Sequence, residues 1–392
     1  MLPFLSISQP NTQYIMLSYW ENKHFTSYDF IIIGSGIVGL STAASLAELH
    51  PNKSILVLEK GIFPTGASTK NAGFACFGSL TELLSDLDYM PLDMVMHLVD
   101  ERWSGLQKLR CRLGDEAIEF IQDGGYELLS DEEIDALDAI DAVNKMLFPL
   151  FKKDVFHIKD ELIEQFGFNS GMVQSVVYNP FEGQIDTGKM MRSLLNYVQQ
   201  KNVTLLTGSE VLHFEDSGSD VRVEVKNTAT NSPIAFSAQK LAICTNAFTP
   251  SLLPNLEVKA GRGQVLVTKP IENLKFKGVF HMDEGYYYFR NHGNRVIFGG
   301  GRNLDFQGES TTEFATTDQI IHTLQQKLKD VILPQQDFEI EHKWAGIMAF
   351  GKNKRPIHKK LSENVAIGVR LGGMGVAIGS SLGEKLAHQL SE

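Results

Sequence analysis

A glycine-rich turn and an acid beyond it carry the clearest chemical signal in the sequence. The turn follows the apolar run 30–33 and leads into a run rich in alanine and leucine; its glycines are Gly34, Gly36 and Gly39. In G-x-G-x-x-G spacing, the first glycine makes the tight turn, the second lets a pyrophosphate approach the backbone, and the third lets helix and strand pack closely. Glu59 ends the next apolar run, where a carboxylate accepts hydrogen bonds from ribose hydroxyls. The pattern predicts a dinucleotide site and leaves NAD and FAD open.

Two further stretches are rich in glycine. Residues 61–79 are dense in Gly, Ala, Ser and Thr, which predicts a loop whose backbone lies close to a ligand. Phe63, Phe74 and Phe77 make this stretch too apolar for a solvated linker. Near the other end of the chain, residues 372–375 open a predicted terminal helix.

A run of three tyrosines precedes Arg290 on a predicted strand. Because side chains alternate along a strand, Tyr286 and Tyr288 share one face and Tyr287 takes the other. One face should line a pocket and the other should pack in the core.

Composition limits the class of protein. The 392 residues carry 36 basic and 47 acidic side chains, a net charge of −11, which argues against nucleic acid or an anionic membrane as the main partner. The three cysteines suit a reducing compartment and give neither a disulfide framework nor a metal site. No signal peptide is evident, and no uncharged apolar run reaches the roughly eighteen residues of a membrane span. We therefore expect a cytoplasmic protein without a metal or a transmembrane segment, in which the first fifteen residues are an extension.

The predicted secondary structure changes in character at two points along the chain. Long amphipathic helices begin at Pro91, and a capping box of Ser130 and Glu133 predicts another helix running toward Leu150. The alternation of predicted strands and helices resumes at Gly183. Such alternation predicts discontinuous domains.

A series of short motifs stands in a characteristic order and spacing beyond the first fingerprint: Gly66-Ala-Ser68, Asn71-Ala-Gly73, Gly183-Gln-Ile-Asp186, Cys244-Thr-Asn-Ala, Arg262-Gly-Gln264, Gly285-Tyr-Tyr-Tyr, Trp344-Ala-Gly346 and Gly373-Met-Gly375 with Gly379 and Gly383. From Ser18 to its end, the chain resembles the D-amino-acid oxidase superfamily of flavoproteins, which includes glycine oxidase, sarcosine oxidase, dimethylglycine dehydrogenase and gamma-glutamylputrescine oxidoreductase. Residues 344–376 are most similar to members that oxidise putrescine derivatives.

The resemblance implies an α/β (α+β two-domain) fold, with a Rossmann-like FAD-binding domain interleaved with a substrate domain built on a mainly antiparallel sheet plus helices. The predicted boundaries are an N-terminal extension at 1–27, an FAD-binding domain at 28–90, 183–260 and 341–392, and a substrate domain at 91–182 and 261–340.

The resemblance also implies FAD as the cofactor, with the start of the last helix against the flavin pyrimidine edge. Asn71 stands where dimethylglycine dehydrogenase has a histidine bonded to FAD, and no cysteine stands at 347–350, where sarcosine oxidase has one. We therefore expect non-covalent FAD, with Cys76 the only thiol near enough by sequence to attach it. The implied cofactor-binding residues are Gly34, Gly36, Ile37, Val38, Gly39, Glu59, Lys60, Gly66, Ala67, Ser68, Asn71, Ala72, Gly73, Val211, Thr245, Asn246, Gly346, Arg370, Gly372, Gly373, Met374, Gly375 and Val376.

One departure concerns the substrate. Amino-acid oxidases of the family carry Gly-x-Arg-Pro where this chain reads Gly346-Ile-Met-Ala, and that arginine binds the substrate carboxylate. A simple glycine or D-amino-acid oxidase is disfavoured unless Arg262, Arg290 or Arg370 replaces it. Arg290 is the best candidate for binding an anion.

The predicted reaction is oxidation of a C–N bond in a small amine or amino acid by hydride transfer to flavin N5, giving an imine that hydrolyses. Oxygen or another carrier would accept the electrons. The candidate substrate-side residues are Tyr286, Tyr288, Arg290, Trp344, Met348 and Lys70. Three alternatives stay open: an FAD-dependent 2-hydroxy-acid dehydrogenase with His281, His292 or His342 as base, a nicotinamide dehydrogenase, and a non-catalytic FAD-binding protein.

Overall fold

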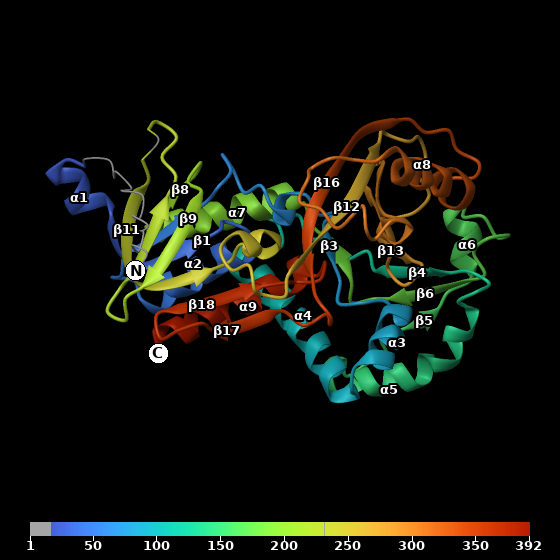
Figure 1. Ribbon diagram of the computed structural model, residues 1–392. Helices are drawn as coiled ribbons and strands as arrows, with labels where there is room; N and C mark the ends of the chain where they lie inside the picture. Colours follow the sequence, from blue (N-terminus) through green and yellow to red (C-terminus); the bar gives the residue numbers. More distant parts are fainter. Residues whose placement is uncertain (1–16, 231) are drawn as a thin grey trace, which may run out of the picture.

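The computed structural model describes residues 17–230 and 232–392 and shows two lobes side by side (Figure 1). Each lobe is built on an eight-stranded sheet. The extension expected over the first fifteen residues lies outside the described residues. Within the described ranges, no helix is both long and apolar enough to span a bilayer.

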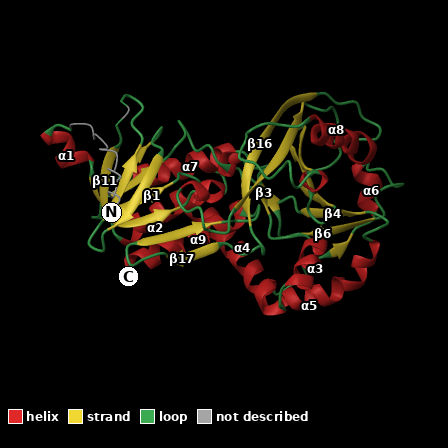
Figure 2. Cartoon of the chain, viewed as in Figure 1, coloured by secondary structure: helices red, strands yellow, loops and turns green. Residues whose placement is uncertain are grey.

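The first sheet, whose strands are drawn in yellow in the left lobe of Figure 2, has the order β17-β18-β11-β1-β2-β8. Strand β10 pairs with both β11 and β9. Its strands are β1 (Ser27–Ile33), β2 (Ile55–Leu58), β8 (Thr204–Leu206), β9 (Val211–Asp216), β10 (Val221–Val225), β11 (Ile234–Ile243), β17 (Ile357–Lys360) and β18 (Val365–Val369). At its centre, β1 runs parallel to β2 and β11. Phe30 and Ile32 face one hydrophobic core and Ile31 and Ile33 face another, which explains why this run is wholly apolar.

The second sheet has the order β16-β12-β15-β14-β13-β4-β6-β5 and is mainly antiparallel. Its strands are β4 (Gly125–Leu129), β5 (His157–Ile158), β6 (Ser175–Asn179), β12 (Lys259–Thr268), β13 (Val279–Met282), β14 (Tyr287–His292), β15 (Arg295–Gly300) and β16 (Ile340–Phe350). A short antiparallel pair, β3 (Phe74–Ala75) with β7 (Gly183–Gln184), lies between the two lobes (Figure 1).

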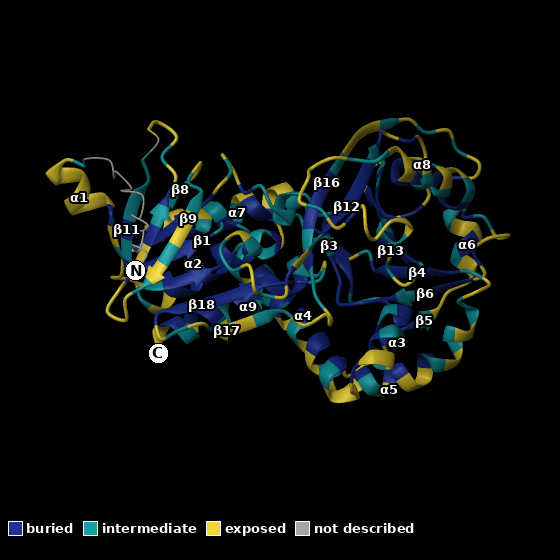
Figure 3. Cartoon of the chain, in the orientation of Figure 1, coloured by how far each residue is buried: buried dark blue, intermediate teal, exposed yellow. Residues whose placement is uncertain are grey.

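Helices cover both sheets. They are α1 (Tyr19–Phe25), α2 (Ile37–Leu49), α3 (Leu80–Tyr89), α4 (Leu92–Leu113), α5 (Ile140–Phe151), α6 (Glu161–Phe166), α7 (Thr187–Gln200), α8 (Asp318–Lys327) and α9 (Gly375–Ser391). In the first lobe α2 packs on α9, and α4 packs on the outer side of α9. Figure 3 shows the buried residues running along both sheets and the inner sides of these helices.

The structure departs from the predicted elements in two places. Residues 341–350, which the sequence analysis assigned to the FAD-binding domain, form β16 and pair with β12 in the second sheet. Ser130 does bond to Glu133, but a 3₁₀ turn over Ile134–Ala139 comes before α5, so the cap does not begin a continuous helix. By contrast, the run rich in alanine and leucine after the glycine turn forms a single helix, α2.

Candidate active site

One cavity of about 1170 Å³ joins the glycine turn of the first lobe to the second sheet. It is lined by the turn between β1 and α2, the loop before β3, the start of α9, and strands β12, β14 and β16. Loops predicted from glycine content alone therefore meet side chains that lie far away in the sequence.

The dinucleotide end of the cavity is made of backbone and one acid. Gly34 has φ of +101°, and a Cβ atom there would lie 2.7 Å from the carbonyl oxygen of Cys244. A Cβ atom at Gly39 would lie 1.9 Å from the carbonyl oxygen of Gly34, so this glycine serves the packing of helix on strand. Glu59 is buried and accepts hydrogen bonds from the Ser35 backbone (3.0 Å) and hydroxyl (2.6 Å). The carboxylate is thereby fixed at the cavity wall.

The opposite segments of the cavity also suit FAD. Ser68 accepts a hydrogen bond from the Ile37 amide (2.9 Å), which ties the loop before β3 to the start of α2. Gly372 and Gly373 have φ of +57° and +87°, a conformation that favours glycine, and they lead into α9. First-turn amides of a helix have no acceptor within the helix, so α2 and α9 both present donors to this cavity. The residues present therefore fit a bound dinucleotide with an anionic diphosphate.

Most of the predicted residues line this cavity. They are Gly34, Gly36, Ile37, Val38, Glu59, Lys60, Gly66, Ala67, Ser68, Lys70, Asn71, Ala72, Val211, Thr245, Asn246, Tyr286, Tyr288, Gly346, Met348, Gly372, Gly373, Met374, Gly375 and Val376. Cys76 lines it as well, and its thiol is free. Non-covalent attachment of FAD stays a prediction.

Arg290 was the preferred candidate for binding an anion, but the structure places its side chain away from the cavity. Its guanidinium is buried and donates to the carbonyl of Ile185 (3.2 Å) and the side chain of Gln184 (2.6 Å), and Ala72 provides another carbonyl acceptor. Burial lowers its pKa to about 10. Since this group already holds the loop before β3 against β7, it does not line the cavity.

Two other arginines are also bound elsewhere. Arg262 forms a buried, bidentate ion pair with Glu309, with distances of 2.9 and 2.6 Å. Arg370, predicted to contact the cofactor, donates instead to the carbonyl oxygens of Arg355 (3.1 Å) and Glu257 (3.3 Å). Neither residue is on the cavity wall.

Three more predicted residues support the wall from behind. Trp344, expected in an apolar wall, donates its indole N–H to the Lys70 carbonyl (2.8 Å). A Cβ atom at Gly73 would lie 2.4 Å from the carbonyl oxygen of Ile185, so this glycine allows close packing away from the cavity. Trp344, Gly73 and Gly39 do not line the cavity, because each of them packs against a neighbouring segment of the chain.

The tyrosines divide as alternation requires. Tyr288 lines the cavity, and burial raises its pKa to about 12, so the phenol stays neutral. Tyr287 packs in the core of the second lobe, and Tyr286 lies partly exposed at the rim. Phe74 packs edge-on against Tyr288, with ring centroids 5.5 Å apart, and extends the aromatic wall.

Lys70 and Met348 complete the central part of the wall. The Lys70 ammonium lies 5.1 Å from the centre of the Phe314 ring, and burial lowers its pKa. The Met348 sulfur would lie 3.7 Å from a Cβ atom at Gly373, so Met348 sits beside the turn that leads into α9.

Arg302 also lines the cavity and was not among the predicted residues. Its guanidinium lies 4.0 Å from the Phe350 ring centre and 5.0 Å from that of Phe306. Its Nε is buried without a hydrogen-bond partner among the described residues. Burial lowers its pKa, although Tyr286 and Glu309 oppose this. The sequence feature that could have identified Arg302 is its position two residues after β15, because β15 pairs with β14, the strand that carries Tyr288.

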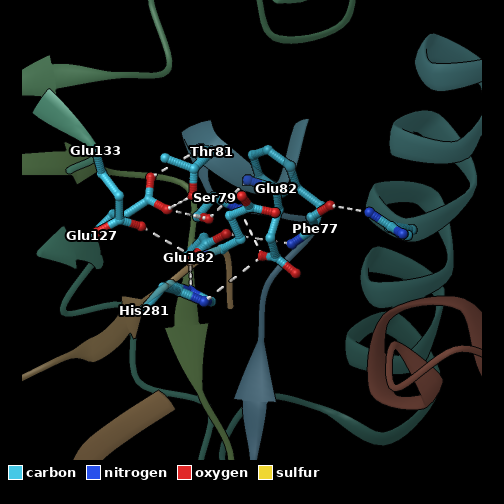
Figure 4. Close-up of polar contacts among 10 residues, drawn as sticks. Phe77, Ser79, Thr81, Glu82, Glu127, Glu133, Glu182 and His281 are labelled. Carbon is cyan, nitrogen blue, oxygen red and sulfur yellow. Dashed lines mark hydrogen bonds and ion pairs between the residues drawn. The ribbon is translucent and has the colours of Figure 1, made fainter. Parts of the chain in front are cut away.

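A second group found only in the structure surrounds His281 (Figure 4). His281 lines the cavity, and its Nε2 lies 3.0 Å from a Glu182 oxygen while its Nδ1 lies 3.9 Å from a Glu82 oxygen. Burial alone would lower the pKa of His281, but the carboxylates of Glu182, Glu82 and Glu127 outweigh burial and raise it to about 9. The imidazole is therefore protonated at neutral pH.

Known proteins match the chain over most of its length. The model of a family described as "DAO: FAD dependent oxidoreductase" matches residues 29–389. Vinyl phenol reductase from Lactiplantibacillus plantarum is 23% identical over 242 residues, which are 60% of this chain and 41% of that protein. The chain thus spans less than half the length of this curated relative.

Two solved structures share the fold. Glycine oxidase from Geobacillus kaustophilus has a TM-score of 0.73 at 18% identity, over 93% of this chain and 95% of that one. L-proline dehydrogenase from P. horikoshii has a TM-score of 0.72 at 19% identity, over 93% of each chain. These likenesses confirm the predicted two-domain α/β fold. With the family match and a cavity that suits a dinucleotide, they show that the chain belongs to the DAO family of FAD-dependent oxidoreductases.

Proposed function

We propose that this protein oxidises the C–N bond of a small amino acid or related amine that carries a carboxylate. The observation that carries the proposal is Arg302, a guanidinium on the wall of the FAD cavity whose Nε is buried without a hydrogen-bond partner in the described part of the chain. A buried polar group without a partner is costly, and the planar fork of arginine matches a carboxylate. The three arginines considered from the sequence are held by other protein groups.

The cavity residues supply binding and orientation. FAD, when bound, provides at its N5 the acceptor of the hydride. Arg302 would hold the carboxylate, while Tyr288, Met348 and Phe74 form an apolar wall that excludes water and orients the C–H bond. Lys70 stands on the same wall, and we assign it a role near the reduced cofactor or the electron acceptor. Water then hydrolyses the imine.

The hydroxy-acid alternative requires a histidine base. Of its three candidate histidines, His281 alone lines the cavity. Its pKa of about 9 leaves it protonated at neutral pH, so it has no free lone pair with which to take a hydroxyl proton. This argues for the amine reaction.

Anaerobic bleaching of the bound flavin tests the proposal. The probe is a matched pair, an N-methyl amino acid and the corresponding N-methyl amine without the carboxylate. The wild-type flavin should bleach faster with the amino acid, and Arg302→Met should remove that preference by about 10- to 100-fold. Readmitting air then shows whether oxygen reoxidises the flavin.

Arg192→Met is the matched control, because Arg192 is an exposed residue of α7 away from the cavity. Bleaching only by 2-hydroxy acids would move the protein to the alternative class. No bleaching by any of these compounds would favour a non-catalytic FAD-binding protein.

A further inference from the structure

The cavity wall around Glu82 is placed to assist one step of the proposed reaction, the removal of a proton from the substrate amine. Hydride transfer from the carbon beside an amine requires neutral nitrogen, whereas an aliphatic amine is an ammonium ion at neutral pH because its pKa is about 10. One proton must therefore leave the substrate inside the cavity. The further inference rests on the proposed amine oxidation and concerns the group that takes this proton.

Three glutamates surround His281, and they differ in access to the cavity. Glu127 and Glu182 are buried and do not line it. Glu82 does line it, with 14% of its side chain exposed. Glu82 thus connects the buried cluster with the space available to a substrate.

Backbone contacts fix the position of Glu82. It belongs to the first turn of α3, where its carboxylate accepts the Ser79 amide (3.0 Å) in a capping box. A Cβ atom at Gly285 would lie 2.6 Å from the Glu82 carboxyl carbon, so the glycine before the tyrosine run leaves room for this side chain. The carboxylate is held at one place instead of moving freely in the cavity.

The cluster also lies next to the reacting part of the cavity. The His281 ring packs edge-on against Phe74, with centroids 5.4 Å apart, and Phe74 in turn packs against Tyr288. Glu82 lies 3.9 Å from His281, and His281 contacts Phe74. The His281 ring therefore lies between Glu82 and the apolar wall that would orient the substrate C–H bond.

The charge balance favours a cation at this wall. Glu82 and Glu182 are two carboxylates beside one imidazolium, which leaves one net negative charge among these three groups. Arg102, the other cation nearby, is buried, donates to the Phe77 carbonyl and does not line the cavity. Burial raises the pKa of Glu127 to about 7, against hydrogen bonds from Ser79 and Thr81. The Cys76 thiol stays neutral, because burial and then the neighbouring carboxylates raise its pKa well above the usual value.

We propose that Glu82 is the catalytic base that takes a proton from the substrate ammonium, and that His281 and Glu182 position its carboxylate. An N–H bond of the ammonium breaks, its electron pair stays on nitrogen, and an O–H bond forms on Glu82. The neutral amine then loses hydride from the adjacent carbon. The proton leaves Glu82 for solvent after turnover, since part of this side chain is exposed.

The other charged groups near Glu82 suit this role less well. Asp86, one helical turn along α3, is paired with Lys354 at 2.6 Å and is almost fully buried. Glu284 lies on an exposed turn, where water screens its charge. The remaining charged or titratable neighbours come from the segment after β3, from β4, β13 and α4, and from the segment before β7. They are Cys76, Glu127, His281, Arg102 and Glu182.

Anaerobic flavin reduction measured against pH tests the assignment. Glu82→Gln keeps an oxygen that can accept the Ser79 amide, so the helix cap is retained. At pH 7 the variant should reduce its flavin about 100-fold more slowly than wild type, the size expected for loss of a general base. The difference in rate between wild type and Glu82→Gln should become smaller as pH approaches the solution pKa of the substrate amine, because the amine then enters the cavity in its neutral form. Glu82→Asp should restore part of the rate.

Asp88→Asn is the matched control, since Asp88 is an exposed carboxylate on the same helix and lies outside the cavity wall. His281→Asn removes the ring that lies 3.9 Å from the Glu82 carboxylate, so it should slow flavin reduction and change the shape of its pH profile. A Glu82→Gln profile that coincides with wild type, or lies lower by one factor at every pH, would overturn the assignment. Failure of every amine to reduce wild-type flavin would overturn the proposed function itself, and that result is visible without any variant.

Discussion

The two ends of the cavity are built in different ways. The dinucleotide end uses glycine turns, two helix starts and Glu59, all close in sequence to the strands that carry them. The substrate end gathers Glu82, His281, Tyr288 and Arg302 from separate elements. At the first end, backbone geometry makes the site. At the second, an arginine is free to bind a substrate only where no protein group has already paired with it, which separates Arg302 from Arg290.

The largest effect should come from the dinucleotide end. Gly39→Val places a branched side chain where even a Cβ atom would lie 1.9 Å from the Gly34 carbonyl oxygen. The first lobe cannot absorb this without moving α2 off β1, so we expect loss of bound FAD and a destabilisation of roughly 3 kcal/mol or more. Flavin content after purification and urea unfolding measure both.

Gly188→Ala serves as the control for that substitution. It lies in the first turn of α7, where the nearest contact of a new Cβ atom is a carboxylate oxygen of Asp186 at 3.3 Å. Flavin content should match wild type. If Gly39→Val also kept its flavin, the dinucleotide end would not depend on backbone approach, and the contrast between the two ends would fail.

A second prediction separates an arginine engaged in an ion pair from an available one. Arg262→Met leaves Glu309 as a buried carboxylate without its cation, which should cost about 3–5 kcal/mol in the free energy of unfolding. The relative rates of flavin bleaching by the matched pair of substrates should not change, because Arg262 is not on the cavity wall. Urea unfolding and the bleaching ratio are the two measurements.

The double variant Arg262→Met with Glu309→Gln should recover part of the lost stability, since it no longer buries an unpaired charge. A change in substrate preference in Arg262→Met would place this residue in the site and weaken the case for Arg302.

The smallest predicted effect is a pH dependence of stability from the cluster around His281. The pKa of His281 is raised from 6.5 to about 9 in the folded protein, so its stabilising contribution is complete below pH 6.5 and is lost as pH rises through 9. Glu127, with a pKa raised from 4.5 to about 7, also makes stability fall as pH rises, but over a lower range. The contribution of these two groups to the free energy of unfolding should therefore decline from pH 4.5 to 9.

His281→Asn should flatten the upper part of that decline by the equivalent of about one proton, while lowering stability overall. Urea unfolding at several pH values between 6 and 10 measures the slope. An unchanged slope above pH 6.5 would show that His281 is not held as an imidazolium, and would remove the positive charge assigned beside Glu82.

The predicted polar residues that do not line the cavity share one cause. Arg290 and Trp344 stand on the correct strands, but each bonds to a carbonyl of the loop before β3, a segment more than two hundred residues away in sequence. Arg370 turns toward carbonyls of other segments in the same way. Single-sequence reasoning could place these residues on strands or loops but could not say which partner each polar group would find.

The sequence by itself determined the cofactor half. A tight turn, a close backbone approach and a helix start depend on glycine spacing over a few residues, so Gly34, Gly36 and Glu59 were readable without a fold. Strand alternation likewise separated Tyr287 from Tyr288. The tertiary structure alone decided the substrate half, because ion pairs and buried hydrogen bonds form between segments distant in the chain. That is why we propose Arg302 and Glu82, and not Arg290, as the side chains that meet the substrate.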